Sequence, residues 1–209
     1  MTVLNQLASA RGLKGSEANI RLAKELSVSK NLHAVKELVA NLTNKDKNIQ
    51  SDCIKTLYEL GYLAPDMIAD YYVEFMRLLK SRNNRLVWGG MIALVTVTEL
   101  KHREIFDSLD RIMLTVGMGS VITIDNGVEI LSLLNKHDCY FDTTDPLLAE
   151  LLWKCPIKQL PMYMEKAQVA VNKRNKEIYL SIIAKRLPEC ESDSQVKRLE
   201  KCMKLLKAR

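Results

Sequence analysis

The most constraining feature of this chain is a helical spacing of apolar residues that recurs about every 37 residues. Three segments share the same order of large aliphatic and small residues, and their starts lie 37 and 36 positions apart. Within them apolar side chains recur at three- and four-residue steps, and a second amphipathic stretch follows each after a short loop. A repeat of this length is typical of stacked helix hairpins. We therefore predict an all-α fold of about ten helices without a β-sheet. The segments are Ile49–Leu57, Leu86–Leu94 and Ile122–Ile130.

Capping patterns indicate where several helices should begin. Ser29 suits the cap of an early helix, because its hydroxyl can accept a bond from a free first-turn N–H group. Asp145 followed by Pro146 fits a cap and a first-turn proline. Ser192 with Gln195 fits a capping box before a lysine-rich last helix.

The repeating segments resemble HEAT-type helical repeats. The stretches that carry the resemblance lie at 48–55, 84–94 and 119–127, and the whole chain is similar to a family of small, uncharacterised bacterial HEAT-repeat proteins. The resemblance implies a single armadillo-like solenoid over residues 1–209, a right-handed α-α superhelix, and implies no activity. Stacked repeats of this kind bury a continuous core and need polar ends. The expected repeats are 16–43, 44–82, 83–119 and 120–156, with capping helices over 157–209.

Composition and charge exclude several classes of protein. Hydrophobic residues make up 47% of the chain and charged residues 27%, which is typical of a globular domain and not of a disordered one. No apolar run is long enough to cross a membrane, and no signal peptide is visible, so we expect a cytoplasmic protein without membrane contact. The net charge of +6 is uneven, since residues 154–209 hold 14 basic and 6 acidic side chains.

Motifs that carry catalysis are missing from the sequence. His33, His102 and His137 lie far apart and form no ligand pair, and neither a P-loop nor a nucleophile elbow occurs. The five cysteines form no CxxC pair. We therefore expect no enzyme activity, no metal and no cofactor.

Three features are candidates for partner binding. Trp88 follows Arg85 and precedes two glycines that weaken a helix by about 1 kcal/mol each, so either close helix packing or an exposed Trp88 anchor should offset that cost. Asp70 and Glu74 share one helix face and give an acidic edge, and the resemblance implies that such second helices line the concave surface. The segment Gly117–Gly127 offers capping groups that could instead hold an anion or a partner carboxylate; they are Ser120, Thr123, Asp125 and Asn126.

Two functions fit these features. The favoured hypothesis is a non-enzymatic interaction or scaffold module that binds a protein or peptide on the concave face. The alternative is a DNA-binding protein, because HEAT-like repeats also form a family of alkylpurine DNA glycosylases, for which Trp88 and Asp125 are nominal candidates. A basic flank could give weak, non-specific nucleic-acid binding in either case. That flank consists of Lys158, Lys166, Lys173 and Arg174.

Overall fold

The computed structural model describes residues 2–208, which form twelve α-helices joined by short 3-10 helices and loops, with no strand in that range. The α-helices are α1 Glu17–Ser29, α2 Leu32–Ala40, α3 Lys47–Leu63, α4 Tyr72–Leu78, α5 Asn84–Val97, α6 His102–Asp107, α7 Leu109–Met118, α8 Val121–Leu134, α9 Phe141–Lys154, α10 Leu160–Ala167, α11 Lys176–Arg186 and α12 Asp193–Lys207. The all-α prediction is confirmed. Residues 2–208 contain two helices more than the ten or so predicted. One reason is that the apolar stretch 105–116 divides into α6 and α7. The backbone bends between them at Ser108, where φ is −105° and ψ is 9°.

The chain divides into two compact units, and the division falls inside α8, after Thr123. Unit 1 runs to Thr123 and unit 2 begins at Ile124. Asn126 and Gly127 occupy the second turn of α8 and are both buried. The predicted single solenoid domain and its repeat boundaries stay predictions. In the described residues, 2–208, the model has no helix that is both long and apolar enough to span a membrane.

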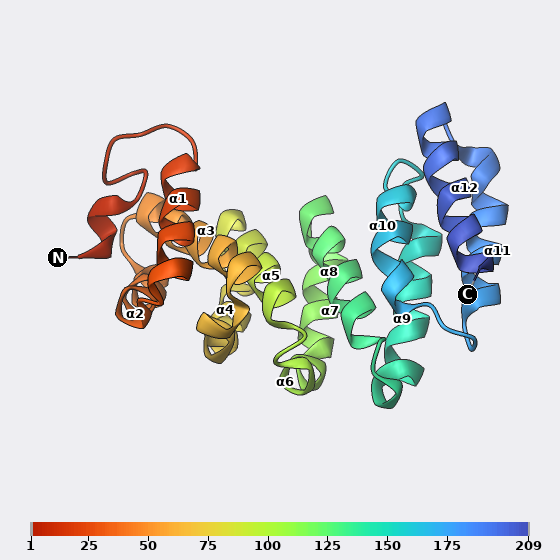
Figure 1. Ribbon diagram of the computed structural model, residues 1–209, viewed down its shortest axis with the longest axis horizontal. Coiled ribbons are helices and arrows are strands. Elements are labelled where there is room, and N and C mark those ends of the chain that lie inside the picture. The colour runs from red at the N-terminus through yellow and green to blue at the C-terminus, as the bar shows by residue number, and fades with distance from the viewer. Residues whose placement is uncertain (1, 209) are drawn as a thin grey trace. The chain divides into compact units, whose positions relative to one another are not determined.

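In unit 1 the helices α1, α3 and α5 follow one another side by side (Figure 1), with α2 against α3 and α4 against α5. The predicted apolar face of α3 is buried at Cys53, Ile54, Leu57 and Leu60. Gly89 lets α5 approach α3 closely, because a Cβ there would lie 2.5 Å from Ile54 Cγ1.

Gly90 serves the same purpose on the side of α5 that meets α4. A Cβ at Gly90 would lie 3.0 Å from the Phe75 carbonyl oxygen and 3.1 Å from Leu78 Cβ. Close helix packing, one of the two explanations for the costly glycine pair, is therefore confirmed.

In unit 2 the last four helices contact one another: α9 meets α10 and α11, and α12 rests on both α10 and α11. The core includes the large side chains of Tyr163 and Tyr179, and α12 contributes Leu199 and Leu206. The cap predicted at Ser192 is confirmed, since Ser192 Oγ accepts a bond from the Gln195 amide at 3.4 Å. The reciprocal bond differs from that of a capping box, because Gln195 Oε1 accepts from the Glu191 amide at 2.8 Å, one residue before the cap.

Two other predicted caps are wrong. Ser29 ends α1, and Asn31 caps α2 instead by accepting a bond from the Ala34 amide at 3.0 Å. Asp145 does not begin a helix, because α9 already starts at Phe141 and Pro146 lies inside it.

Asp145 is instead the centre of a buried polar network in unit 2. Its Oδ1 atom accepts bonds from the side chains of Asn135 at 3.0 Å, Asn175 at 2.6 Å and Tyr179 at 2.9 Å. All four residues are at most 5% exposed. Burial together with the Asp145 carboxylate raises the pKa of Tyr179 well above its usual range. The network joins the end of α8 to α9 and α11, since each of these segments supplies a member.

A buried arginine completes the packing around the end of α9. Arg186 is 6% exposed, and its Nη1 atom donates to the carbonyl oxygens of Leu152 at 3.0 Å and Cys155 at 2.8 Å. Its Nε and Nη2 atoms both reach Glu189 Oε2. The guanidinium thus satisfies carbonyls at the negative end of the α9 dipole, where a cation is favoured.

Candidate functional site

The candidate site is a groove of about 510 Å³ that crosses α1, α3 and α5 in unit 1. We call it the Trp88 groove. It is open to solvent and combines an aromatic and aliphatic wall with a few charged side chains. Its lining residues are Gly15, Ser16, Asn19, Ser51, Asp52, Ile54, Lys55, Tyr58, Arg85, Trp88, Gly89, Ile92 and Ile122.

Helical spacing explains why these side chains share one surface. Ser51, Lys55 and Tyr58 lie at steps of four and three along α3, and Arg85, Trp88 and Ile92 lie at steps of three and four along α5. Each set therefore occupies one face of its helix. Because α3 and α5 are packed together through Gly89, the two faces form one continuous surface.

Trp88 is half-buried and separates this groove from a second hollow. The second hollow, of about 230 Å³, is lined by Trp88 together with Met118, Ser120 and Thr123. Ser120 Oγ and Thr123 Oγ1 lie 3.5 Å apart at the start of α8. Trp88 lines both cavities, so it lies between Arg85, which lines the groove, and Ser120 and Thr123, which line the second hollow.

Lys55 is fixed in the groove by its neighbours on α3. Its Nζ atom lies 2.6 Å from Glu59 Oε1 and 4.7 Å from the centre of the Tyr58 ring. Partial burial disfavours the charged ammonium, but the bonds to Glu59 and Tyr58 outweigh that effect and raise the pKa of Lys55. The positive charge of Lys55 is therefore largely balanced by contacts within the protein.

Asp52 fastens the N-terminal segment to the groove. Its carboxylate accepts bonds from the Ser9 amide and from Asn19 Nδ2, each at 2.7 Å. Asn19 in turn accepts a bond from the Ala8 amide at 2.9 Å. Arg85, in contrast, is exposed, and its side chain makes no ion pair within the described part of the chain.

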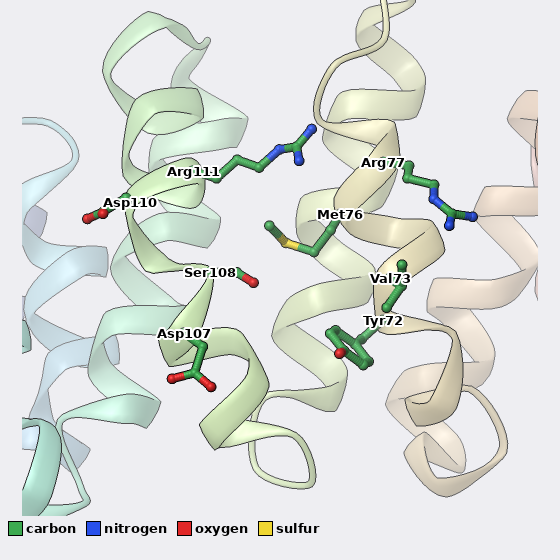
Figure 2. Close-up of a pocket in the computed structure, with 8 residues that line it drawn as sticks. All are labelled: Tyr72, Val73, Met76, Arg77, Asp107, Ser108, Asp110 and Arg111. Atoms are coloured by element: carbon green, nitrogen blue, oxygen red, sulfur yellow. The ribbon is translucent and has the colours of Figure 1, made fainter.

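A different cavity, of about 400 Å³, lies between α4 and the α6–α7 segment. Figure 2 shows the Arg111, Met76, Tyr72 and Ser108 side chains directed into the space between the helices, whereas Arg77 points away from it. Asp107 and Asp110 line the same cavity. This cavity lies on the second helices, where the resemblance placed the binding surface, but the larger Trp88 groove lies on the first helices.

The predicted acidic edge is compensated by basic side chains. The two residues do not share one helix, because Asp70 lies in the short 3-10 helix Ala69–Tyr71 and Glu74 lies in α4. Asp70 lies 2.8 Å from Lys101, and Glu74 lies 3.5 Å from Arg77. Neither carboxylate is therefore a free negative charge on the surface of unit 1.

The remaining predicted residues belong to unit 2. Asp125 accepts a bond from the Tyr163 hydroxyl at 2.6 Å, and burial followed by this contact raises the pKa of Tyr163 well above its usual range. Lys166 bonds to the Asp125 carbonyl oxygen at 3.2 Å and to Glu129 at 2.6 Å. Asp125 therefore holds helices together, and Asn126 is buried.

The basic flank is only partly available. Arg174 bonds to Asp142 at 2.6 Å and stacks over Phe141, while Lys158 and Lys173 are exposed and make no ion pair within residues 2–208. No group of three or more His, Cys, Asp or Glu residues in that range could hold a metal ion.

Sequence reasoning missed Lys55, Tyr58, Ile92 and Ile122 as groove residues. The sequence carries a signal for three of the α3 positions. Ser51, Lys55 and Tyr58 recur at steps of four and three, so they form one accessible face of α3 beside its apolar face. Which helix lies next to that face depends on tertiary packing, and periodicity alone does not supply it.

Comparisons with known proteins bear on the fold alone. No protein-family model matches the chain, and no curated protein matches it. The chain is similar in fold to the crystal structure of an engineered protein from the Northeast Structural Genomics Consortium, with a TM-score of 0.65 and 15% sequence identity. The match covers 100% of this chain and 98% of the engineered one.

Proposed function

We propose that the protein is a HEAT-like, armadillo-type α-solenoid that acts as a non-enzymatic interaction module and takes a segment of a partner protein in the Trp88 groove. The observation that carries the proposal is the groove itself, which crosses the adjacent helices α1, α3 and α5 and places a half-buried Trp88 one turn from the unpaired Arg85. Tryptophan and arginine are the residue types most often found at the energetic centre of protein interfaces.

Several features of unit 1 support binding over catalysis. The groove is open to solvent across α1, α3 and α5, whereas a small-molecule site usually encloses most of its ligand. Two of its three charged groups are fixed, Lys55 by Glu59 and Asp52 by backbone and amide donors. Neither arrangement pairs a nucleophile with a base, as covalent catalysis needs.

The DNA-binding alternative has less support. A glycosylase-type site needs a carboxylate that is free to face a nucleotide, and Asp125 is bonded to Tyr163. Lys166 and Arg174 are paired with Glu129 and Asp142. We keep a cytoplasmic location as part of the proposal, on the composition of the chain.

The proposal can be tested with an array of short random peptides probed with the labelled protein. We expect a subset of peptides to be retained, and we expect Trp88→Ala to abolish most of that retention. An aromatic anchor of this kind contributes about 2 kcal/mol or more to binding, which is roughly thirtyfold in affinity.

Trp153→Ala is the matched control. Trp153 is also a partly exposed tryptophan, at 39%, but it belongs to unit 2 and contacts Lys185. Retention that is equal for both variants, with thermal unfolding showing that both are folded, would disprove binding in the Trp88 groove.

A further inference from the structure

One end of the Trp88 groove continues into a polar hollow of about 310 Å³ in unit 1. The two cavities share Gly15, Ser51, Asp52 and Arg85. The hollow is otherwise lined by the N-terminal loop and by Asn48 in the first turn of α3. A ligand that lies on Trp88 can therefore extend past Arg85 into this end.

The segments around the polar end are rich in basic side chains. Six of them are exposed and form no ion pair within residues 2–208: Arg11, Lys14, Lys45, Lys47, Arg82 and Arg85. The acidic residues of the same segments are fewer. They are Glu17, Asp46 and Asp52. The Glu17 carboxylate lies beside Gly15 in the first turn of α1 and offsets one of the six basic charges. Asp46 caps α3 by accepting a bond from the Asn48 amide, and Asp52 accepts its two bonds from Ser9 and Asn19.

Helix dipoles add to this positive potential. Gly15 lies just before α1, Asn48 is in the first turn of α3, and Arg85 is in the first turn of α5, so three helices begin around the hollow. The N-terminus of a helix carries a partial positive charge from its free N–H groups. Ser16, the N-cap of α1, makes no side-chain capping bond to those groups.

The opposite end of the groove is apolar. Trp88, Ile92 and Ile122 form its wall, with Tyr58 beside them, and Ile122 is 38% exposed. The groove thus changes along its length from a basic end to an aromatic and aliphatic end.

Resting on the function proposed above, we propose that the partner segment is an acidic peptide with one bulky apolar side chain. The apolar side chain packs on Trp88 and Ile92, and a neighbouring carboxylate pairs with the Arg85 guanidinium. Complementary charge of this kind steers a partner to its site and fixes its register. A phosphate backbone fits less well, because it carries a charge at every step, whereas the apolar wall of Trp88, Ile92 and Ile122 offers those charges no partner.

The test uses fluorescence anisotropy with peptides retained on the array and with versions whose acidic residues are changed to Gln or Lys. A labelled DNA duplex and a labelled single strand are measured beside them. The protein variants are Arg85→Glu and Trp88→Ala. Arg103→Glu is the control, because Arg103 is an exposed arginine on α6, outside the groove.

We expect the acidic peptides to bind and the Lys versions to lose binding. Arg85→Glu should weaken the acidic peptides about tenfold, Trp88→Ala about thirtyfold, and Arg103→Glu less than about twofold. Arg85→Glu changes an exposed side chain, so its effect can be measured even if Trp88→Ala loosens the fold.

Other results separate the two proposals. Retention that depends on Trp88 but favours neutral or basic peptides overturns the acidic partner and leaves the interaction module in place. If no peptide is retained in a Trp88-dependent way, both proposals fail. If the oligonucleotides bind at physiological salt and need Trp88, nucleic acid replaces the peptide as the ligand.

Discussion

At the scale of single residues, the glycines show how closely the helices of unit 1 are fitted. Gly89 and Gly90 lie in the middle of α5, where glycine lowers helix stability. The loss is offset because α3 and α4 can approach α5 more closely than any side chain would allow. Gly117 is different, since a Cβ there would meet no atom within 4 Å.

This contrast gives a matched pair of substitutions. Gly89→Ala should lower the free energy of unfolding by about 1–2 kcal/mol, because overpacking against Ile54 outweighs the gain in helix propensity. Gly117→Ala, in α7, should raise it by about 0.5–1 kcal/mol. Urea denaturation of both variants checks this, and equal midpoints would contradict the account of the α3–α5 contact.

At the scale of elements, the polar network of unit 2 replaces a purely apolar contact between helices. Asp145 receives three bonds from donors on other segments, and none of these donors is a cation. Loss of one donor leaves part of a buried carboxylate unsatisfied, which is costly.

Tyr179 makes the network sensitive to alkaline pH. Burial and the Asp145 carboxylate raise the pKa of Tyr179 in the folded protein, while the unfolded chain keeps a value of about 10. Above about pH 10 the unfolded state loses the tyrosine proton and the folded state keeps it. The contribution of Tyr179 to stability is therefore complete below that pH and falls as pH rises toward the folded pKa.

Tyr179→Phe tests this linkage. The variant should be less stable by about 2 kcal/mol at pH 8, because it lacks the hydroxyl that donates to Asp145. Its stability should also fall less steeply than that of the parent between about pH 9.5 and 11. Denaturant midpoints across this range measure both effects, and parallel curves would show that the hydroxyl is not linked to folding.

The sequence predicts the helices and their buried faces better than it predicts which segments those helices contact. The spacing of Cys53, Ile54, Leu57 and Leu60 identifies the buried face of α3 because periodicity is a local property. The Asp145–Pro146 pair predicts a helix cap because it is a local pattern, but the bonding partners Asn175 and Tyr179 lie thirty or more positions away. No local rule contains that information.

The candidate site divides in the same way. The glycine pair on α5 indicates Trp88 and Arg85 as candidates, because all four residues lie close together in the sequence. Lys55 and Tyr58 come from α3 and Ile122 from the start of α8, so they join the groove only through packing.

At the scale of the whole molecule, the distribution of charge along the chain predicts how the protein binds polyanions. The excess of basic residues over 154–209 should give weak DNA binding at low salt that fades steeply between about 50 and 200 mM. Within the described C-terminal flank, Lys158 and Lys173 are the predicted contacts that make no ion pair. Reversing both charges should therefore weaken binding more than Trp88→Ala does.

Anisotropy with a labelled duplex across a salt series measures this binding. It should show no preference for sequence or for damaged bases, since only phosphates are contacted. Tight binding at physiological salt that depends on Asp125 would contradict the expectation and would revive the DNA-binding alternative.

The position of Asn126 and Gly127 in α8 also affects how fast Asn126 is deamidated. An Asn–Gly pair in a flexible chain loses ammonia readily, because the glycine nitrogen can attack the side-chain amide and close a five-membered ring. Helical backbone geometry holds that nitrogen away from the amide carbon. Chemical damage at this bond therefore requires α8 to open first, so the rate at which Asn126 becomes an acid records how often the helix unwinds.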